Sequence, residues 1–272
     1  MTTWRPCSAS AWRHSGLLAA ALEAARAGAA VLREVGLGHR PGELKLRSGD
    51  YVTDADRASE QAIVDTLVRL SPGIPILAEE RGGASAGTRW AVDPLDGTTN
   101  FTRAMPVVGV SVALLDGGLP VVGAVIAPWL GLEFAVQRGR GATLNGARLP
   151  PLDPGDPSTA VVATGFPFRV KQRMGRYLPV LKESLRRFED ARRAGSAALD
   201  LAWTAAGTFD GFFELGLGTW DVAAGAALVL EVGGRVTDWS GGPEWIDTGD
   251  ILAGPAAVHE VLLELARQAP GG

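Results

Sequence analysis

The chain has 272 residues, 46% of them hydrophobic and 21% charged, and its 26 basic and 30 acidic side chains give a net charge of −4. Because charges of both signs are interspersed, no field of one sign is available to hold nucleic acid, and we expect no nucleic-acid partner. The single cysteine, Cys7, excludes a disulfide framework and a cysteine-ligated metal site, which favours a cytoplasmic protein.

The chain opens with a helical pattern. Apolar residues recur at helical spacing from about Ser15 to Val35, which predicts an amphipathic helix. Its most apolar stretch, Leu17 to Ala30, contains Glu23 and Arg26. This stretch is too short to span a bilayer, so we expect no membrane segment.

A second helix and several short strands complete the first half. After a Gly-containing loop at 36–50, the pattern predicts a helix from about Asp54 to Leu70. The Asp-Gly-Gly sequence at 116–118 separates two β-rich runs and predicts a hairpin. The predicted strands of this half cover residues 74–78, 90–92, 107–115, 121–128 and 132–137.

The second half alternates strands with helices. The predicted strands cover 160–164, 211–214, 235–237 and 251–253, and the predicted helices cover 175–188, 197–206, 221–232 and 256–268. This alternation argues for sheets covered by helices, a layered α/β sandwich. The Pro- and Asp-rich segment 150–157 is the expected boundary between an N-terminal sub-domain, 11–150, and a C-terminal sub-domain, 151–270.

The string from Asp93 to Phe101, Asp-Pro-Leu-Asp-Gly-Thr-Thr-Asn-Phe, is the most informative part of the sequence. It places two carboxylates three residues apart on a tight turn after a buried strand, and Glu79 ends a neighbouring strand. These carboxylates would repel one another unless they are protonated or hold a cation. A hard divalent ion such as magnesium fits, because it takes oxygen ligands that include backbone carbonyls such as that of Leu95.

Other readings of these residues are open. Asp96-Gly97 alone is an ordinary turn pair, and Asp56 is also read as a helix-start residue. Glu79 and Glu80 are also read as a solvated strand end, and Asp221 as a helix N-cap. The full nine-residue string favours function, because chance matches of that length are rare.

The helix that Gly97-Thr98-Thr99 would open offers free backbone N–H groups to an anion. A phosphate held there would lie beside the bound metal ions. Paired ions at one site can activate a water, screen a phosphate and stabilise a leaving alkoxide.

These segments, in this order and spacing, resemble the inositol monophosphatase family from about residue 17 to 265. The matching segments are Val52 to Asp56, Ala78 to Glu80, Asp93 to Phe101, Gly195 to Asp200, Phe212 to Glu214 and Gly218 to Gly225. The resemblance implies an α/β (α+β) fold, a layered αβαβα sandwich of the sugar-phosphatase type with two sub-domains. It also implies lithium inhibition and a homodimer.

The resemblance implies roles for individual residues. Two or three Mg²⁺ ions would be bound by carboxylates and one carbonyl, namely Glu79, Asp93 and Leu95 for the first ion and Asp93, Asp96 and Asp221 for the second. A third, weaker ion would lie near Glu79. The catalytic residues would be Asp56, Thr98 and Glu79 at the attacking water, with Lys45 approaching from a mobile flap. Substrate would contact Asp96, Gly97, Thr98, Gly195, Ser196, Ala197, Glu214 and Asp221.

The sequence therefore predicts a Mg²⁺-dependent phosphatase that hydrolyses myo-inositol monophosphates and related polyol or sugar phosphates. The small-molecule alternatives are histidinol phosphate, fructose 1,6-bisphosphate and 3′-phosphoadenosine 5′-phosphate, which are substrates of related families. A second phosphate could use one of the arginines at 186, 187, 192 and 193, which are otherwise a solvated helix face. An alternative of another class is a regulatory or scaffold protein with the same fold.

Overall fold

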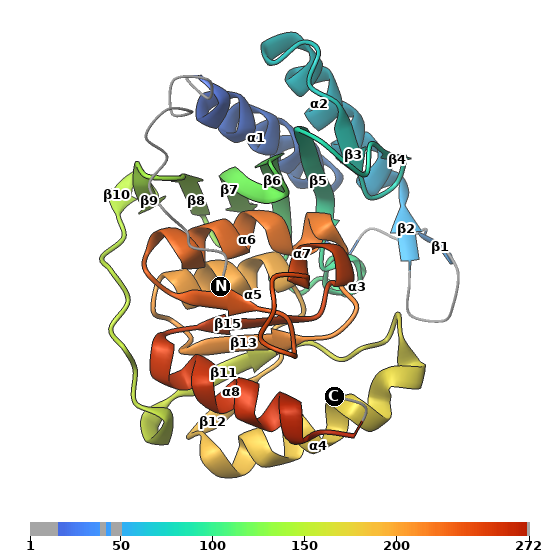
Figure 1. Cartoon of the computed structure of the whole chain (residues 1–272). Coiled ribbons are helices and arrows are strands. Elements are labelled where there is room, and N and C mark those ends of the chain that lie inside the picture. Colours follow the sequence, from blue (N-terminus) through green and yellow to red (C-terminus); the bar gives the residue numbers. More distant parts are fainter. Residues whose placement is uncertain (1–15, 39–41, 45–50, 271–272) are drawn as a thin grey trace.

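Layers of helices and sheets stack in the order αβαβα in this computed structural model, which describes residues 16–38, 42–44 and 51–270 (Figure 1). The outermost helices at one end are α1 (Leu17–Val35) and α2 (Asp54–Leu70), which cover one face of an eight-stranded sheet. The layered αβαβα sandwich expected from the sequence is confirmed. The N-terminal residues before Gly16 and the predicted catalytic Lys45 lie outside the described residues.

The first layer is packed closely because α1 is rich in alanine and has a glycine, Gly28, at its contact with α2. A Cβ atom at Gly28 would lie 2.7 Å from both Ile63 Cδ1 and Ser59 Oγ, so only glycine allows α1 to approach α2 this closely. The helix α2 begins at a capping box, in which the Thr53 hydroxyl accepts from the Asp56 amide and the Asp56 carboxylate accepts from the Thr53 amide. This cap fixes Asp56 at the sheet end of α2.

The eight-stranded sheet carries the predicted hairpin, formed by β6 (Gly109–Asp116) and β7 (Leu119–Ala127). In spatial order its strands are β10 (Ala147–Arg148), β9 (Gly141–Leu144), β8 (Leu132–Gln137), β7, β6, β5 (Arg89–Asp96), β3 (Ile76–Ala78) and β4 (Gly82–Gly83). β3 and β5 are parallel, whereas the other neighbours are antiparallel. The carboxyl ends of β3 and β5 therefore lie at the same sheet edge, where Glu79 and Asp93 are located.

The middle layer consists of α5 (Ala197–Ala205) and α6 (Thr219–Glu231), which pack between the two sheets (Figure 1). The second sheet is five-stranded, in the order β12 (Asp190–Arg192), β11 (Val161–Thr164), β13 (Gly211–Glu214), β15 (Ile251–Gly254) and β14 (Arg235–Thr237). The last layer is α4 (Met174–Arg187) with α8 (Ala256–Gln268), and both cover the outer face of this sheet.

The remaining elements are short. They are the strand pair β1 (Gly42–Leu44) and β2 (Tyr51–Thr53), the helices α3 (Thr98–Thr102) and α7 (Trp245–Thr248), and the 3₁₀ turns Pro157–Thr159 and Lys171–Arg173. The strands β1, β2, β4, β9, β10 and β12 and the helix α7 were not predicted from the sequence, and β1 lies within the predicted loop 36–50.

Several predicted boundaries differ from the structure by one to four residues, and two of them concern the site. β5 continues past the predicted end at Val92 through Pro94 to Asp96. α6 starts at Thr219, with Gly218 as its N-cap. Asp221 is therefore not the N-cap but the third residue of the helix, and its carboxylate accepts a hydrogen bond from the Gly218 amide.

The division into sub-domains at about residue 150 stays a prediction. Each sheet is built from one side of that boundary. However, α5 and α6 pack against strands of both sheets, so the two halves share a core.

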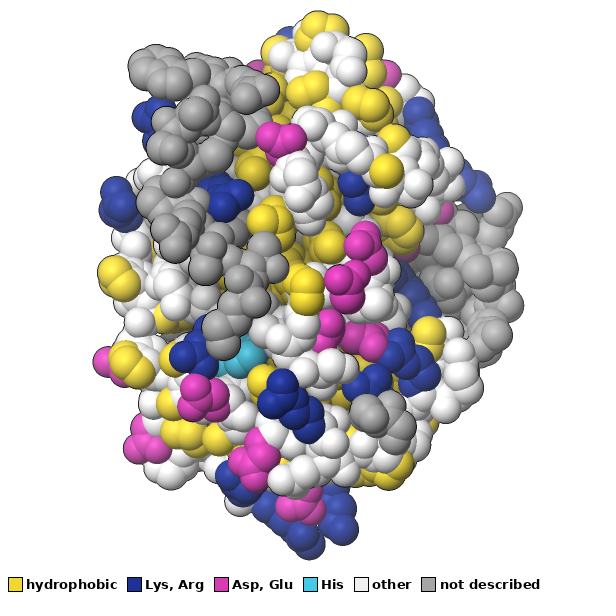
Figure 2. Space-filling view, viewed as in Figure 1, with side chains coloured by type: hydrophobic (Ala, Val, Ile, Leu, Met, Phe, Trp, Pro, Cys, Tyr) yellow, Lys and Arg dark blue, Asp and Glu magenta, His cyan; other side chains and the backbone are white. Residues whose placement is uncertain are grey.

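No helix of the described residues is long and apolar enough to cross a membrane. Acidic and basic side chains are interspersed over most of the face seen in Figure 2.

The contact between α5 and α6 gives a stability prediction. A Cβ at Gly225 of α6 would lie 2.4 Å from the Leu201 Cβ of α5, an atom that cannot rotate away. We expect Gly225→Ala to lower the free energy of unfolding by about 2 kcal/mol, because a clash of about 3 kcal/mol outweighs a helix-propensity gain of about 1 kcal/mol. Urea denaturation measures the change.

Gly175→Ala is the matched control, because a Cβ at this glycine of α4 would meet nothing within 4 Å. We expect Gly175→Ala to raise the free energy of unfolding by up to about 1 kcal/mol. Equal effects of the two variants would contradict the close approach of α5 and α6.

Candidate active site

An irregularity at the end of β5 brings two carboxylates together. In a regular strand, residues three apart point to opposite faces. The pairing of β5 with β6 shifts register between Asp93 and Asp96, and the Asp93 Oδ1 accepts a hydrogen bond of 2.9 Å from the Leu95 amide. Carboxylate oxygens of Asp93, Asp96 and Asp221 consequently lie within 4.8 Å of one another.

Asp221 reaches this group from the first turn of α6. Its Oδ2 accepts from the Gly218 amide at 2.6 Å and from Arg169 Nη1 at 2.8 Å. Its Oδ1 and the Asp93 Oδ2 are both buried and have no hydrogen-bond partner among the described residues. Buried, unpartnered carboxylate oxygens are costly, so these two atoms call for a ligand.

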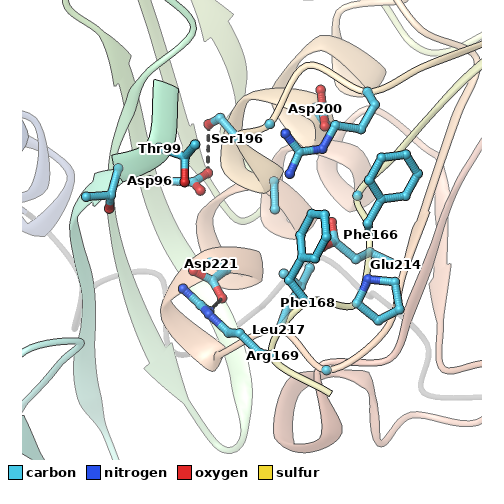
Figure 3. Close-up of a pocket in the computed structure, with 18 of the residues that line it drawn as sticks. Asp96, Thr99, Phe166, Phe168, Arg169, Ser196, Asp200, Glu214, Leu217 and Asp221 are labelled. Atoms are coloured by element: carbon cyan, nitrogen blue, oxygen red, sulfur yellow. Dashed lines mark hydrogen bonds and ion pairs between the residues drawn. The ribbon is translucent and has the colours of Figure 1, made fainter. Parts of the chain in front are cut away.

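Asp96 is held from the other side by α5. Its Oδ2 accepts a hydrogen bond of 2.7 Å from the Ser196 hydroxyl and another of 2.7 Å from the Ala198 amide (Figure 3). Burial, followed by the charge of Asp221, raises the pKa of Asp96 to about 7 against the effect of these two donors. Burial also raises the pKa of Asp93 well above its usual range, with further contributions from Glu79, Asp96 and Asp221.

The donor set at this point fits a hard cation. The groups gathered here offer oxygen atoms and no nitrogen or sulfur ligand. Such a set suits Mg²⁺ or Ca²⁺ and not a zinc site built from His or Cys. A divalent ion would compensate the repulsion that raises these pKa values and would coordinate the unpartnered oxygens.

Asp56 and Thr98 form a pair beside the carboxylate cluster. The Thr98 hydroxyl lies 3.3 Å from Asp56 Oδ1 and 3.2 Å from the Leu95 carbonyl oxygen, and it can donate to either. Asp56 is fully buried, and this burial raises its pKa to about 6, although the Thr53 hydroxyl and amide act in the opposite direction. A carboxyl with that pKa can exchange a proton near neutral pH.

Glu79 is near the cluster but is not among the carboxylates gathered within 4.8 Å in the described residues. Its Oε1 lies 3.1 Å from Nη2 of Arg169, whose Nη1 contacts Asp221. One guanidinium thus joins two of the predicted metal ligands. No local sequence pattern singles out Arg169, and its role becomes visible only in the folded chain.

The loop that carries Arg169 is fixed to the second sheet. Arg173 donates to both carboxylate oxygens of Asp250, with a distance of 2.6 Å from Nη1 to Oδ1. The same Oδ1 accepts from the Gly216 amide at 3.0 Å. This arrangement anchors residues 165–173 at the carboxyl end of β13.

A cavity of about 770 Å³ opens over the carboxylates and is wide enough for a sugar-sized ligand. In Figure 3, Asp96 lies on one side of the cavity, and Phe166 and Phe168 lie on the other. The N-terminus of α3 faces this space, as expected from the sequence. The predicted substrate-binding residues all line it, namely Asp96, Gly97, Thr98, Gly195, Ser196, Ala197, Glu214 and Asp221.

Sequence reasoning missed Phe166, Phe168 and Arg169 of the cavity wall, and it gave no role to Asp200, which ends one of the segments that match the family. Of the four arginines considered for a second phosphate, three form surface ion pairs and one, Arg193, lines the cavity. The Arg193 guanidinium lies 5.5 Å from the centre of the Phe166 ring and 5.8 Å from that of Phe168.

The layered fold with an acidic cluster at its cavity is that of metal-dependent phosphatases. The chain belongs to the inositol monophosphatase family, whose sequence profile it matches over residues 14–270. The resemblance inferred from the motifs is therefore confirmed, and phosphatase activity is supported for the family as a whole.

Known relatives carry two kinds of name. A protein of Escherichia coli K12 named Nus factor SuhB is 44% identical over 219 residues, which cover 79% of this chain and 82% of that protein. An inositol-1-monophosphatase of Mesorhizobium japonicum is 40% identical over 223 residues, 81% of this chain and 84% of that protein. The structure of an inositol monophosphatase from Anabaena superposes with a TM-score of 0.85 and 35% identity, over 95% of this chain and 98% of that one.

The position of Arg169 predicts an effect on metal binding. A cation that binds Asp221 and Glu79 must compete with this guanidinium. We expect Arg169→Met to tighten Mg²⁺ binding by about 3- to 10-fold, a modest gain because the Arg169 side chain is 41% exposed and solvent weakens its ion pairs. Calorimetric titration of the metal-free protein measures the dissociation constant.

Arg193→Met is the control, because Arg193 lines the same cavity and contacts the two phenylalanine rings. Its Mg²⁺ affinity should equal that of the unchanged protein. Weaker or unaltered Mg²⁺ binding by Arg169→Met would show that the guanidinium does not compete with the ion.

The raised pKa of Asp96 predicts a pH dependence. Below about pH 7 the metal-free carboxyl carries a proton that an incoming ion must displace, whereas above pH 7 it is already ionised. For one displaced proton, the Mg²⁺ dissociation constant should rise about tenfold per pH unit below 7 and level off above it. Titration in buffers of different ionisation enthalpy measures the released protons, and equal affinity at pH 6 and 8 without proton release would refute the assignment.

Proposed function

We propose that this protein is a Mg²⁺-dependent hydrolase of phosphate monoesters that acts on myo-inositol monophosphates and related polyol or sugar phosphates. The observation that carries the proposal is the group of three carboxylates, two of them buried and each of those two with one unpartnered oxygen, beside a cavity of about 770 Å³. Family membership and the inositol-1-monophosphatase name of one relative support it.

The proposed ligands divide into two groups. Glu79, Asp93 and the Leu95 carbonyl would hold one ion, Asp93, Asp96 and Asp221 would hold a second, and a third ion is part of the proposal. When bound, magnesium would neutralise the carboxylates, screen the phosphate and make a bound water more acidic. Asp93 belongs to both groups, which agrees with its central position and its free Oδ2.

Asp56 and Thr98 are proposed to handle the proton of the attacking water. The Thr98 hydroxyl can donate its hydrogen to Asp56 and accept one from a water in the cavity. The proton would then pass to Asp56, whose pKa of about 6 lets it accept and later release the proton near neutral pH. Lys45 is proposed as a further catalytic residue, and it lies outside the described part of the chain.

Substrate binding is proposed to use both ends of the cavity. The N-terminus of α3 offers backbone N–H groups to the phosphate. On the opposite wall, Glu214 would accept hydrogen bonds from substrate hydroxyl groups, with Gly195, Ser196 and Ala197 lining the space between. Histidinol phosphate and fructose 1,6-bisphosphate remain alternative substrates of the same site.

A regulatory role is the second candidate, because several relatives are named Nus factor SuhB. The carboxylate cluster favours an enzyme. Three acidic groups this close together repel one another without a cation, and a role in protein binding alone would not require them. We keep the cytoplasm, a homodimer and lithium inhibition as expectations that accompany the enzymatic proposal.

Phosphate release by the purified protein with Mg²⁺ tests the proposal on inositol 1-phosphate, histidinol phosphate, fructose 1,6-bisphosphate and glycerol 2-phosphate. We expect the highest kcat/KM on inositol 1-phosphate and a loss of at least about 100-fold in Asp96→Asn, which removes a charge from the cluster. Asp65→Asn is the control, because this carboxylate lies on α2, accepts a hydrogen bond from the Gln61 side chain and does not line the cavity.

If the protein prefers another of these esters, the proposed substrate is wrong and the proposed mechanism stands. If no phosphate is released from any ester, the regulatory role is favoured. A strain lacking the gene separates the two roles. If the Asp96→Asn protein corrects the defect of that strain although it no longer hydrolyses phosphate esters, the enzymatic account of the biological role is wrong.

A further inference from the structure

Asp200 is a buried carboxyl of the cavity wall to which the proposed mechanism gives no role. It lies in the first turn of α5 and is only 1% exposed, yet it lines the cavity over the carboxylate cluster. Its Oδ1 is buried without a hydrogen-bond partner in the part of the chain that the structure describes. An unsatisfied buried carboxyl is rare enough in folded proteins to require an explanation.

The position of Asp200 follows from the way α5 is attached to the site. The Ser196 hydroxyl and the Ala198 amide, at the start of this helix, both bind the Asp96 carboxylate at 2.7 Å. These bonds fix the first turn of α5 against one proposed metal ligand. Asp200 follows Ser196 by four residues, about one helical turn, so it lies on the same face of α5 as Ser196, and its side chain lines the same cavity (Figure 3).

A structural role for this carboxyl is a poor explanation. An ionised Asp near a helix N-terminus gains about 0.3–1 kcal/mol from the helix dipole. Burial, followed by the charge of Asp96, raises the pKa of Asp200 well above its usual range, although the charge of Arg193 lowers it. Burial disfavours the ionised form that the dipole would stabilise, so this interaction does not compensate a loss of hydrogen bonds to water of about 1–3 kcal/mol.

The surroundings of Asp200 indicate what it would bind. Glu214 lines the same cavity, and burial, followed by the charge of Asp200, raises its pKa well above the usual range. A Cβ at Gly165 would lie 2.0 Å from Glu214 Oε2, so the absence of a side chain at Gly165 makes room for that carboxyl. Each of these two carboxyls can accept a hydrogen bond from a hydroxyl group, and each can also donate one when it carries a proton.

We propose that Asp200 is a specificity-determining residue of this cavity, where its carboxyl group hydrogen-bonds a hydroxyl group of the polyol part of a phosphate monoester. This inference rests on the proposed function, because the phosphate of such a ligand must lie at the carboxylate cluster. Asp200 lies farther along α5 than the residues that bind Asp96, and it would act on the alcohol part of the substrate. It would have little effect on a phosphate ester without hydroxyl groups.

The stability of the free protein distinguishes this role from a structural one. Replacing an unpartnered buried carboxyl by an apolar group of similar size removes a desolvation cost. We therefore expect the urea midpoint of Asp200→Leu to lie above that of the unchanged protein. A residue kept for stability would give the opposite shift.

The decisive measurement is the ratio of kcat/KM for myo-inositol 1-phosphate to kcat/KM for phenyl phosphate, which has no hydroxyl group. We expect this ratio to fall about 10- to 100-fold in Asp200→Leu and less in Asp200→Asn, which keeps a donor and an acceptor. Hydrolysis of phenyl phosphate should stay within about threefold of the unchanged protein, because the carboxylate cluster is intact. An unchanged ratio in Asp200→Leu overturns the inference, and if that variant does not fold, an unchanged ratio in Asp200→Ala does so.

Thr204→Val is the matched control. Thr204 is buried one turn farther along α5, and its hydroxyl donates to the Asp200 carbonyl at 2.8 Å. We expect this variant to lower the urea midpoint and to leave the ratio unchanged. An equal fall of the ratio in Thr204→Val would show that any disturbance of α5 alters selectivity, and would overturn the specific role of Asp200.

A binding measurement separates this inference from the proposed function. Calorimetric titration of myo-inositol into the protein with Mg²⁺ and inorganic phosphate needs no turnover. Binding that is lost in Asp200→Leu supports the inference even if no phosphate ester is hydrolysed, in which case only the proposed function fails. Binding that is equal in both proteins overturns the inference even if hydrolysis occurs, and no binding with no hydrolysis removes both.

Discussion

Repulsion among buried carboxylates is the constraint on which the rest of this structure depends. Two unit charges 4 Å apart repel by about 4 kcal/mol at an effective dielectric constant of 20. Asp93, Asp96 and Asp221 have oxygens within 4.8 Å of one another, and Asp93 and Asp221 are buried. The protein reduces this cost with backbone amides, the Ser196 hydroxyl and the Arg169 guanidinium, and it leaves two oxygens for a cation.

The αβαβα stack is what brings these groups to one place. α5 and α6 lie between the two sheets, so the N-termini of both helices meet the carboxyl end of β5. The first sheet contributes the turn at Asp93, α6 contributes Asp221, and α5 contributes the donors to Asp96. The same attachment of α5 places Asp200 on the cavity wall, so metal binding and recognition of the alcohol part depend on one helix.

The sequence predicted both the long elements and the local motifs well, but the physical reason is different for each. Helices such as α2 and α8 carry strong apolar periodicity, and the turn after Asp93 is a contiguous string whose chemistry is readable without a fold. Strands of two to four residues such as β9, β10 and β12 escaped prediction, because pairing with a neighbour stabilises them and not their own composition. Pro94 hid the true end of β5, since proline argues against a strand interior.

The sequence by itself determined the family, the layered fold class and the acidic residues available for a cation, because each of these is encoded in contiguous residues or in a short period. Only the tertiary structure decided that Arg169 joins Glu79 to Asp221 and that Asp200 reaches the cavity without a partner. Arg169 lies 52 positions from Asp221 and 90 from Glu79 in the chain. Contacts across such separations depend on how the layers pack, and no local pattern records them.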